Sequence, residues 1–228
     1  MEKAQVAQHV ETHRVEGQVD ADMDHPIVTD VDDEKRNKSL NRRLDKRVLP
    51  LLCWIYLLNF LDRGNAGNAK VLNSETGDDM LTQANMTAAE FSIAITMFSL
   101  CYFLFEVPSN WVMKHYVRPS LWLGFLLFAW GCVTIGFAGV QNAATVIVLR
   151  MLIGIFEAGF FPGIVYYITI WYRHNERAVR IGLVTAFCNL AGAFGGSIAY
   201  GIGHANGNGG LEGFRWLFII EGLTTVIT

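Results

Sequence analysis

The chain has 228 residues, of which 52% are hydrophobic and 17% charged, and its formal net charge at pH 7 is −3. Its mean hydropathy is positive, whereas disordered or strongly charged proteins have a low mean hydropathy. Most of the acidic excess lies in the first part of the chain, and nothing in the composition points to a nucleic-acid partner.

Residues 1–47 differ in composition from the rest of the chain. They contain 9 of the 18 Lys and Arg residues and 11 of the 21 Asp and Glu residues, and they include no long apolar run. Such a segment buries too little surface to offset the entropy lost on ordering. We therefore expect a disordered tail. No apolar stretch near Met1 resembles a secretory signal, so the run that begins near Val48 must itself direct insertion.

The remainder, residues 48–228, contains apolar runs long enough to cross a membrane. A spanning helix needs about 20 mostly apolar residues to cross a hydrocarbon core of about 30 Å. Five runs meet this requirement, at residues 48–68, 90–113, 119–140, 144–172 and 179–203. A sixth run, 214–228, extends only about 22 Å as a helix. The sequence predicts an all-α polytopic membrane protein whose sixth helix is truncated, as in a fragment or an incomplete gene product.

Positive charge alternates between the loops. Lys and Arg are dense in 35–47 and recur in the loops 114–118 and 173–180. The other loops contain little more than Lys70 and Arg215. Because Lys and Arg are retained on the cytoplasmic side, this pattern predicts a cytoplasmic N-terminus.

Ionisable residues lie inside the predicted spans: Asp62 and Arg63 in the first, Glu106 in the second, and Arg150 and Glu157 in the fourth. Each costs about 2.5–3.5 kcal/mol at a helix centre, so such groups usually face a partner or a water-filled cavity. Arg150 and Glu157 are seven positions apart, which places them on one helix face. The first and fourth helices hold Asp62, Arg63 and Arg150 at similar depth, with Glu157 deeper, which indicates a binding site. The alternative is a purely structural ion-pair network.

Two further features of the spans concern hydrogen bonding and packing. Tyr102 and Asn189 could line a cavity or bond between helices. The GxxxG patterns at 159–163 and 192–196 predict close helix packing, and Pro162 predicts a kink just after Glu157.

Four motifs resemble a known family. Residues 57–63 read LLNFLDR, 105–110 read FEVPSN, 156–163 read FEAGFFPG and 215–222 read RWLFIIEG. In this order they resemble the anion:cation symporter branch of the major facilitator superfamily, and most of all the fungal allantoate and nicotinate permeases. The resemblance extends from about Arg42 to the end.

This resemblance implies a transporter of two six-helix bundles that works by alternating access, of which the chain supplies the N-terminal bundle. Asp62 then matches a protonation site and Arg63 the cation that contacts the substrate anion. Arg150 and Glu157 match the pair that couples protons to substrate movement. Tyr102 and Asn189 match positions that line the substrate cavity.

The implied function is proton-coupled symport of a small organic carboxylate across the plasma membrane, with a second bundle needed for activity. The superfamily's loop 2–3 signature is altered, because Lys114 replaces its acid, and 192–196 lacks the proline typical of antiporters. The second departure favours symport over drug efflux. Alternative hypotheses are a uniporter or exporter, or a truncated protein that does not transport and instead assembles with or regulates a full-length transporter. No pattern indicates an enzyme, a cofactor or a metal site.

Overall fold

The computed structural model describes residues 28–228, with side chains from Asn37 onward, and these residues form helices and no strand. The elements are α2 (Val28–Val71), η1 (Ser74–Thr76), α3 (Met80–Gln83), α4 (Ala88–His115), α5 (Pro119–Gly136), η2 (Phe137–Gly139), α6 (Ala143–Ala158), α7 (Phe160–Trp171), α8 (His174–Gly203), η3 (Asn208–Gly210) and α9 (Gly213–Ile227).

The chain divides into two compact units, Met1–Lys46 and Arg47–Thr228, and α2 runs through the division. Pro50 lies inside α2 and lacks the N–H that would bond the carbonyl of Lys46, so the division falls where the helix loses a hydrogen bond. Residues 28–47 are helical, whereas the sequence predicted disorder there. They are rich in Lys and Arg, which are good helix formers. The rest of the predicted disordered tail, 1–27, lies outside the described residues.

Within the described part of the chain, four helical stretches are long and apolar enough to cross a membrane: Ala88–His115, Pro119–Gly139, Ala143–Trp171 and His174–Gly203. The predicted first span lies in α2, where Asn59, Asp62 and Arg63 lower the apolar character of the helix. The predicted sixth span is α9, which has 15 residues.

The fourth span is interrupted at Gly159, between α6 and α7. This break lies just past Glu157 and three residues before Pro162, where a kink was expected. A Cβ atom on Gly159 would lie 1.9 Å from Ser109 Oγ, so α4 approaches the break too closely for any larger residue. The break thus coincides with a close approach of α4 to Gly159 and lies near Pro162, which has no N–H.

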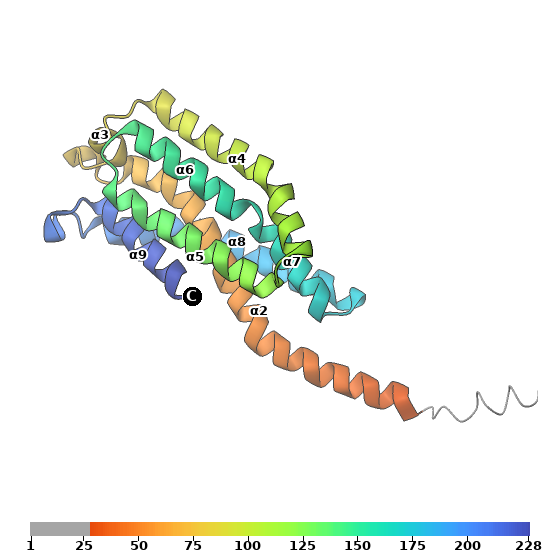
Figure 1. Ribbon diagram of the computed structural model, residues 1–228. Helices are drawn as coiled ribbons and strands as arrows, with labels where there is room; N and C mark the ends of the chain where they lie inside the picture. Colours follow the sequence, from red (N-terminus) through yellow and green to blue (C-terminus); the bar gives the residue numbers. More distant parts are fainter. Residues whose placement is uncertain (1–27) are drawn as a thin grey trace, which may run out of the picture. The chain divides into compact units, whose positions relative to one another are not determined.

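Two helix pairs form the frame of the second unit. α4 lies along α6, and α5 lies along α9 (Figure 1). A Cβ on Gly154 of α6 would lie 2.5 Å from the carbonyl oxygen of Phe98 on α4, and a Cβ on Gly222 of α9 would lie 2.9 Å from that of Gly131 on α5. Small residues therefore allow both pairs to pack at backbone distance.

The GxxxG pattern of α8 does not make a close helix contact like those of Gly154 and Gly222. Added Cβ atoms at Gly192 and Gly196 would meet no atom of the described residues within 4 Å. The expectation of close packing there is wrong within this unit. The glycines of the pattern in α6–α7, at 159 and 163, do lie against other helices.

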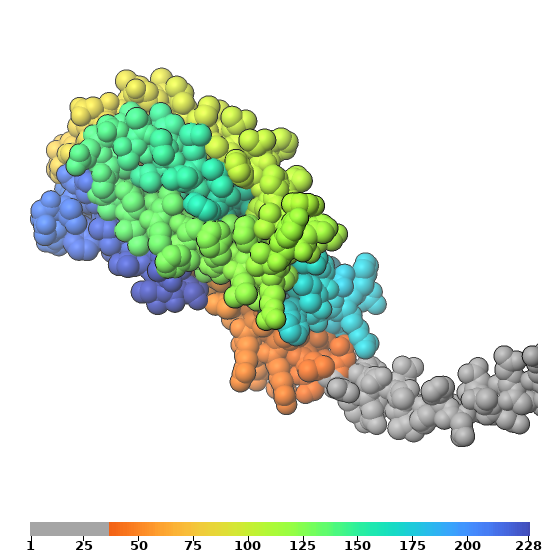
Figure 2. Space-filling view, in the orientation of Figure 1, coloured from red at the N-terminus to blue at the C-terminus, as the bar shows by residue number. Residues whose placement is uncertain are grey.

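The outer surface of α4 is apolar. In the space-filling view α4 lies beside α6 at the surface of this unit (Figure 2). Its exposed large side chains are Ile93, Ile95, Leu100, Phe103, Leu104, Phe105, Val107 and Trp111. Such a face is suited to lipid.

Asn206 forms hydrogen bonds that connect the loops at one end of this unit. Its amide donates a hydrogen bond of 2.8 Å to Asp78 Oδ2, and its Oδ1 accepts one of 2.9 Å from the Gly213 backbone. The Asn206 amide, and then the Thr76 hydroxyl, hold the pKa of Asp78 below its ordinary value by bonding its ionised form. The loop after α2 and the start of α9 are thereby held together.

Candidate functional site

Five charged side chains from three helices lie inside the second unit: Asp62 and Arg63 on α2, Arg150 and Glu157 on α6, and Glu221 on α9. Asp62, Arg150, Glu157 and Glu221 are each no more than 7% exposed. Because an isolated charge is costly to bury, each must be stabilised by its neighbours. The side chains form two groups that share α2 and α6.

The first group is an ion pair between α2 and α6. Arg63 Nε donates to Glu157 Oε1 at 2.7 Å. The amide of Asn59, one helical turn before Arg63, donates to the same oxygen. Glu157 Oε2 is buried and has no hydrogen-bond partner among the described residues. Glu157 Oε1 therefore accepts two hydrogen bonds, whereas Oε2 accepts none within the described structure.

Arg63 is held among aromatic rings. Its guanidinium carbon lies 4.8 Å from the ring centroid of Tyr102, 5.5 Å from that of Phe98 and 5.6 Å from that of Phe60. These are distances at which a cation is attracted to a ring face. The Arg63 side chain is nevertheless 34% exposed, whereas that of Glu157 is 0% exposed. Of the two partners, the cation is the one that a molecule from outside the unit can reach.

The second group surrounds Arg150, which is 3% exposed. Arg150 interacts electrostatically with Asp62, then with Glu157 and Glu221. Its guanidinium carbon lies 4.8 Å from the ring centroid of Phe137. Its Nε and Nη2 have no hydrogen-bond partner among the described residues. Arg150 thus balances several carboxylates through space without bonding closely to any one of them through these nitrogens.

Both carboxyl groups beside Arg150 have their own donors. Thr134 Oγ1 on α5 donates to Asp62 Oδ2 at 3.2 Å. The Asn65 amide donates to both oxygens of Glu221 at 2.9 Å. This group therefore joins α2, α5, α6 and α9.

The predicted site residues are only partly brought together. Asp62 and Arg63 are adjacent in sequence but belong to different groups, because successive side chains of a helix point in different directions. Glu157 forms its ion pair with Arg63, and its interaction with Arg150 is only electrostatic. Tyr102 lies against Arg63. Asn189 is exposed on α8 and makes no hydrogen bond to either group within the described structure.

Sequence reasoning did not include Asn59, Asn65, Thr134 and Glu221 among the site residues. Glu221 could have been found as an acid inside the sixth apolar run, and it lies within one of the quoted motifs. Asn59 and Asn65 lie three residues before Asp62 and three after it, so they share its side of the helix. Thr134 gave no signal, because threonine is common in apolar helices.

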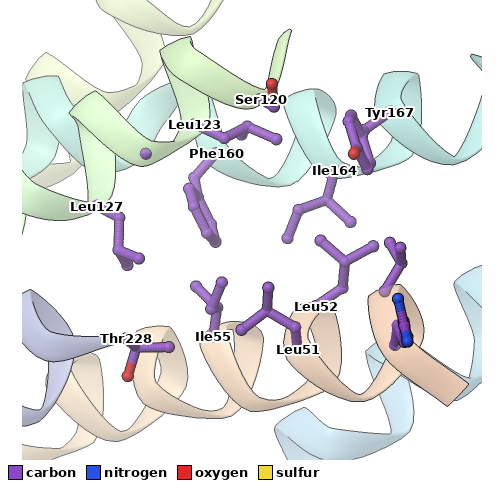
Figure 3. Close-up of a pocket in the computed structure, with 13 residues that line it drawn as sticks. Leu51, Leu52, Ile55, Ser120, Leu123, Leu127, Phe160, Ile164, Tyr167 and Thr228 are labelled. Atoms are coloured by element: carbon purple, nitrogen blue, oxygen red, sulfur yellow. The ribbon is translucent and has the colours of Figure 1, made fainter.

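A separate pocket of about 240 Å³ lies among α2, α5 and α7. Leu51, Leu52 and Ile55 of α2 face Leu127, Phe160 and Ile164 across it (Figure 3). Its lining is apolar apart from Arg47, Ser120, Tyr167 and Thr228. None of the buried charges lines the pocket, so it is not the candidate site for an anion.

The described residues contain no group of three or more His, Cys, Asp or Glu side chains that could hold a metal ion. All four cysteines are free thiols. The chemistry available in the two buried groups is therefore ion pairing, hydrogen bonding and proton exchange.

Comparison with known proteins identifies the family. Residues 52–228 match the Major Facilitator Superfamily. The MFS transporter prlL of Fungal sp. (strain NRRL 50135) is 51% identical over 191 residues, which cover 84% of this chain and 38% of the relative. The major facilitator-type transporter hxnP of Emericella nidulans is 34% identical over 198 residues, covering 86% of this chain and 39% of the relative. The chain thus spans about two fifths of the length of these relatives.

A solved structure shows the same fold. A bacterial homologue of the human lysosomal transporter Spinster, in an inward-facing and occupied conformation, superposes with a TM-score of 0.63 at 21% identity. The superposition covers 80% of this chain and 42% of the solved one. With the apolar helices described above, these findings identify an integral membrane protein of a transporter family rather than an enzyme. The chain belongs to the major facilitator superfamily.

Proposed function

We propose that this chain forms the N-terminal bundle of a proton-coupled symporter for a small organic carboxylate, in the anion:cation symporter branch of the superfamily. The observation that carries the proposal is the Arg63–Glu157 pair, in which a partly exposed cation is bonded to a buried carboxylate. Asp62, Glu157 and Arg150 are assigned to proton coupling. Arg63 and Tyr102 are assigned to substrate binding, with Asn189 as a further position lining the cavity.

The pair couples substrate binding to protonation, because the substrate and Glu157 compete for Arg63. A substrate carboxylate that binds the exposed guanidinium competes with Glu157 for the same positive charge. When Arg63 turns towards the substrate, Glu157 loses its counter-charge inside the protein, and a buried carboxylate without a counter-charge favours protonation. One anion and one proton then enter the site together. This coupling needs no metal or cofactor.

Alternating access requires a second wall for the substrate cavity. In this fold the cavity lies between two bundles, and the chain spans 38% of the length of its relative prlL. We propose that transport depends on this bundle together with a second one. A chimera in which the chain is joined to the remaining part of prlL provides the protein for transport measurements.

The function is tested with the chimera reconstituted in vesicles that carry an imposed proton gradient. We expect radiolabelled nicotinate, or another carboxylate from a panel of small organic acids, to accumulate above its equilibrium level when the outside is acidic. A protonophore should abolish the accumulation. Equilibration without accumulation would indicate a uniporter. Absence of uptake of every acid in the panel would refute carboxylate transport.

The orientation follows from the loop charges and is tested by thiol labelling. We propose a plasma-membrane protein with a cytoplasmic N-terminus. Glu75 lies in η1 and Asn175 in the first turn of α8, and both are exposed. A membrane-impermeant thiol reagent should label Glu75→Cys in intact cells and Asn175→Cys only after permeabilisation, with the unmodified chain as the background control. The reverse pattern would overturn the orientation.

A further inference from the structure

Asp62 and Glu221 form a carboxyl pair between α2 and α9. Glu221 accepts hydrogen bonds from Asn65, which lies about one helical turn after Asp62 on the same side of α2, and both acids are buried, at 4% and 7% exposure. Asp62 Oδ1 has no hydrogen-bond partner among the described residues. Two neighbouring buried carboxylates repel each other when both are ionised. A proton on one of them removes this repulsion.

Charge balance leads to the same result. The buried cluster contains the carboxyl groups of Asp62, Glu157 and Glu221 and the guanidinium groups of Arg63 and Arg150. With every group ionised, the cluster would hold one uncompensated negative charge in a low-dielectric interior, which is strongly unfavourable. A single proton makes the cluster neutral. Because Arg63 bonds to Glu157, the carboxyl groups left to share Arg150 are Asp62 and Glu221.

Among the described residues, the helices packed against the pair contribute no basic side chain to it besides Arg150. Asp62 faces Arg150 and Glu157 from α6, and Thr134 and Trp130 from α5. Glu221 faces Asn65 on α2 and Arg150 on α6. Thr134 and Asn65 donate hydrogen bonds but carry no charge. Arg150 is thus the cation that both acids share.

We propose that Asp62 and Glu221 hold one proton between them and so form a second protonation site, which links α2 to α9 and is distinct from the Arg63–Glu157 pair. The proton is taken from water on one side of the membrane and released, unchanged in number, when the two carboxyl groups separate. Glu221 becomes a member of the proton pathway. The role in coupling rests on the proposed function, whereas the shared proton itself does not.

The shared proton is tested by infrared spectroscopy on the purified chain in lipid nanodiscs at neutral pH. Ionised surface acids do not give a protonated-carboxyl band, whereas the pair should. When one acid is substituted, the remaining acid still has Arg150 as its counter-charge and its own hydrogen-bond donor, so it should be ionised. We therefore expect Asp62→Asn and Glu221→Gln each to remove the same band completely. Glu106→Gln, which changes a half-buried acid on α4 outside the buried cluster, should retain it.

Isotope labelling gives a readout without substitutions, should the variants fail to fold. In the unmodified chain, labelling the side-chain carboxyl of either aspartate or glutamate should shift the band. Loss of only part of the band in each variant would mean two independent protons and would overturn the proposal. So would a band that responds to only one label, or no band at all. Because no transport is measured, failure of the symport proposal would leave this result unaffected.

Discussion

Replacing Glu157 by Gln should abolish proton-driven accumulation of the substrate while leaving substrate binding and exchange intact. Gln has nearly the same shape as a protonated Glu but cannot lose a proton. The Asn59 amide and Arg63 Nε now donate to Glu157 Oε1, and the Gln carbonyl can still accept from them. The cavity would keep its geometry, but the variant would be fixed in the protonated state. Since coupling requires a group that changes protonation as the cavity changes side, the gradient could no longer drive uptake.

The measurement compares two activities of the chimera in the same vesicles. Exchange of labelled for unlabelled substrate should continue at near the unmodified rate, whereas accumulation under an acidic exterior should fall to simple equilibration. Glu106→Gln is the matched control, because Glu106 is a half-buried acid on α4 outside both buried groups. It should retain accumulation. Gradient-driven accumulation by Glu157→Gln would remove Glu157 from the mechanism and leave Asp62 and Glu221 as the candidates.

The sequence predicted which residues are costly to bury, but not how they pair. An acid or a base in an apolar run is visible without a structure, so Asp62, Arg63, Arg150 and Glu157 could be found. Their partners depend on how each helix is rotated about its axis. Arg63 and Glu157 are 94 positions apart, and no local rule connects them. The spacing of Arg150 and Glu157 placed both on one helix face but could not show that Glu157 bonds to Arg63, because periodicity describes one helix and not its neighbours.

The fold, too, could be predicted only where it depends on the local sequence. The apolar runs at 90–113, 119–140 and 179–203 overlap α4, α5 and α8, because hydropathy and length are local properties. The break at Gly159 could be expected only approximately: Pro162 predicted a kink just after Glu157, but the close approach of Ser109 to Gly159 is a tertiary contact. Whether a GxxxG pattern packs is also a tertiary property. The pattern at 159–163 meets another helix, and the pattern at 192–196 does not.

Replacing Arg63 by Lys should weaken substrate binding by about tenfold, or about 1.4 kcal/mol, with little change in expression or thermal stability. When Arg63 turns from Glu157 to the substrate, its guanidinium can bind a carboxylate with two parallel hydrogen bonds. Lysine has a single ammonium group on a different stem, so it binds the same carboxylate more weakly. It keeps the positive charge, so the buried carboxylate is not left uncompensated and the fold should persist.

The affinity of the purified chimera for its carboxylate substrate is measured by competition binding, alongside its melting temperature. Arg118→Lys is the matched control, because Arg118 is exposed at the start of α5 and makes no capping hydrogen bond. It should change neither quantity. The aromatic rings of Tyr102 and Phe98 attract either cation, so the loss should come from the missing hydrogen bonds rather than from the charge. An unchanged affinity in Arg63→Lys would show that Arg63 only joins α2 to α6 and that the anion binds elsewhere.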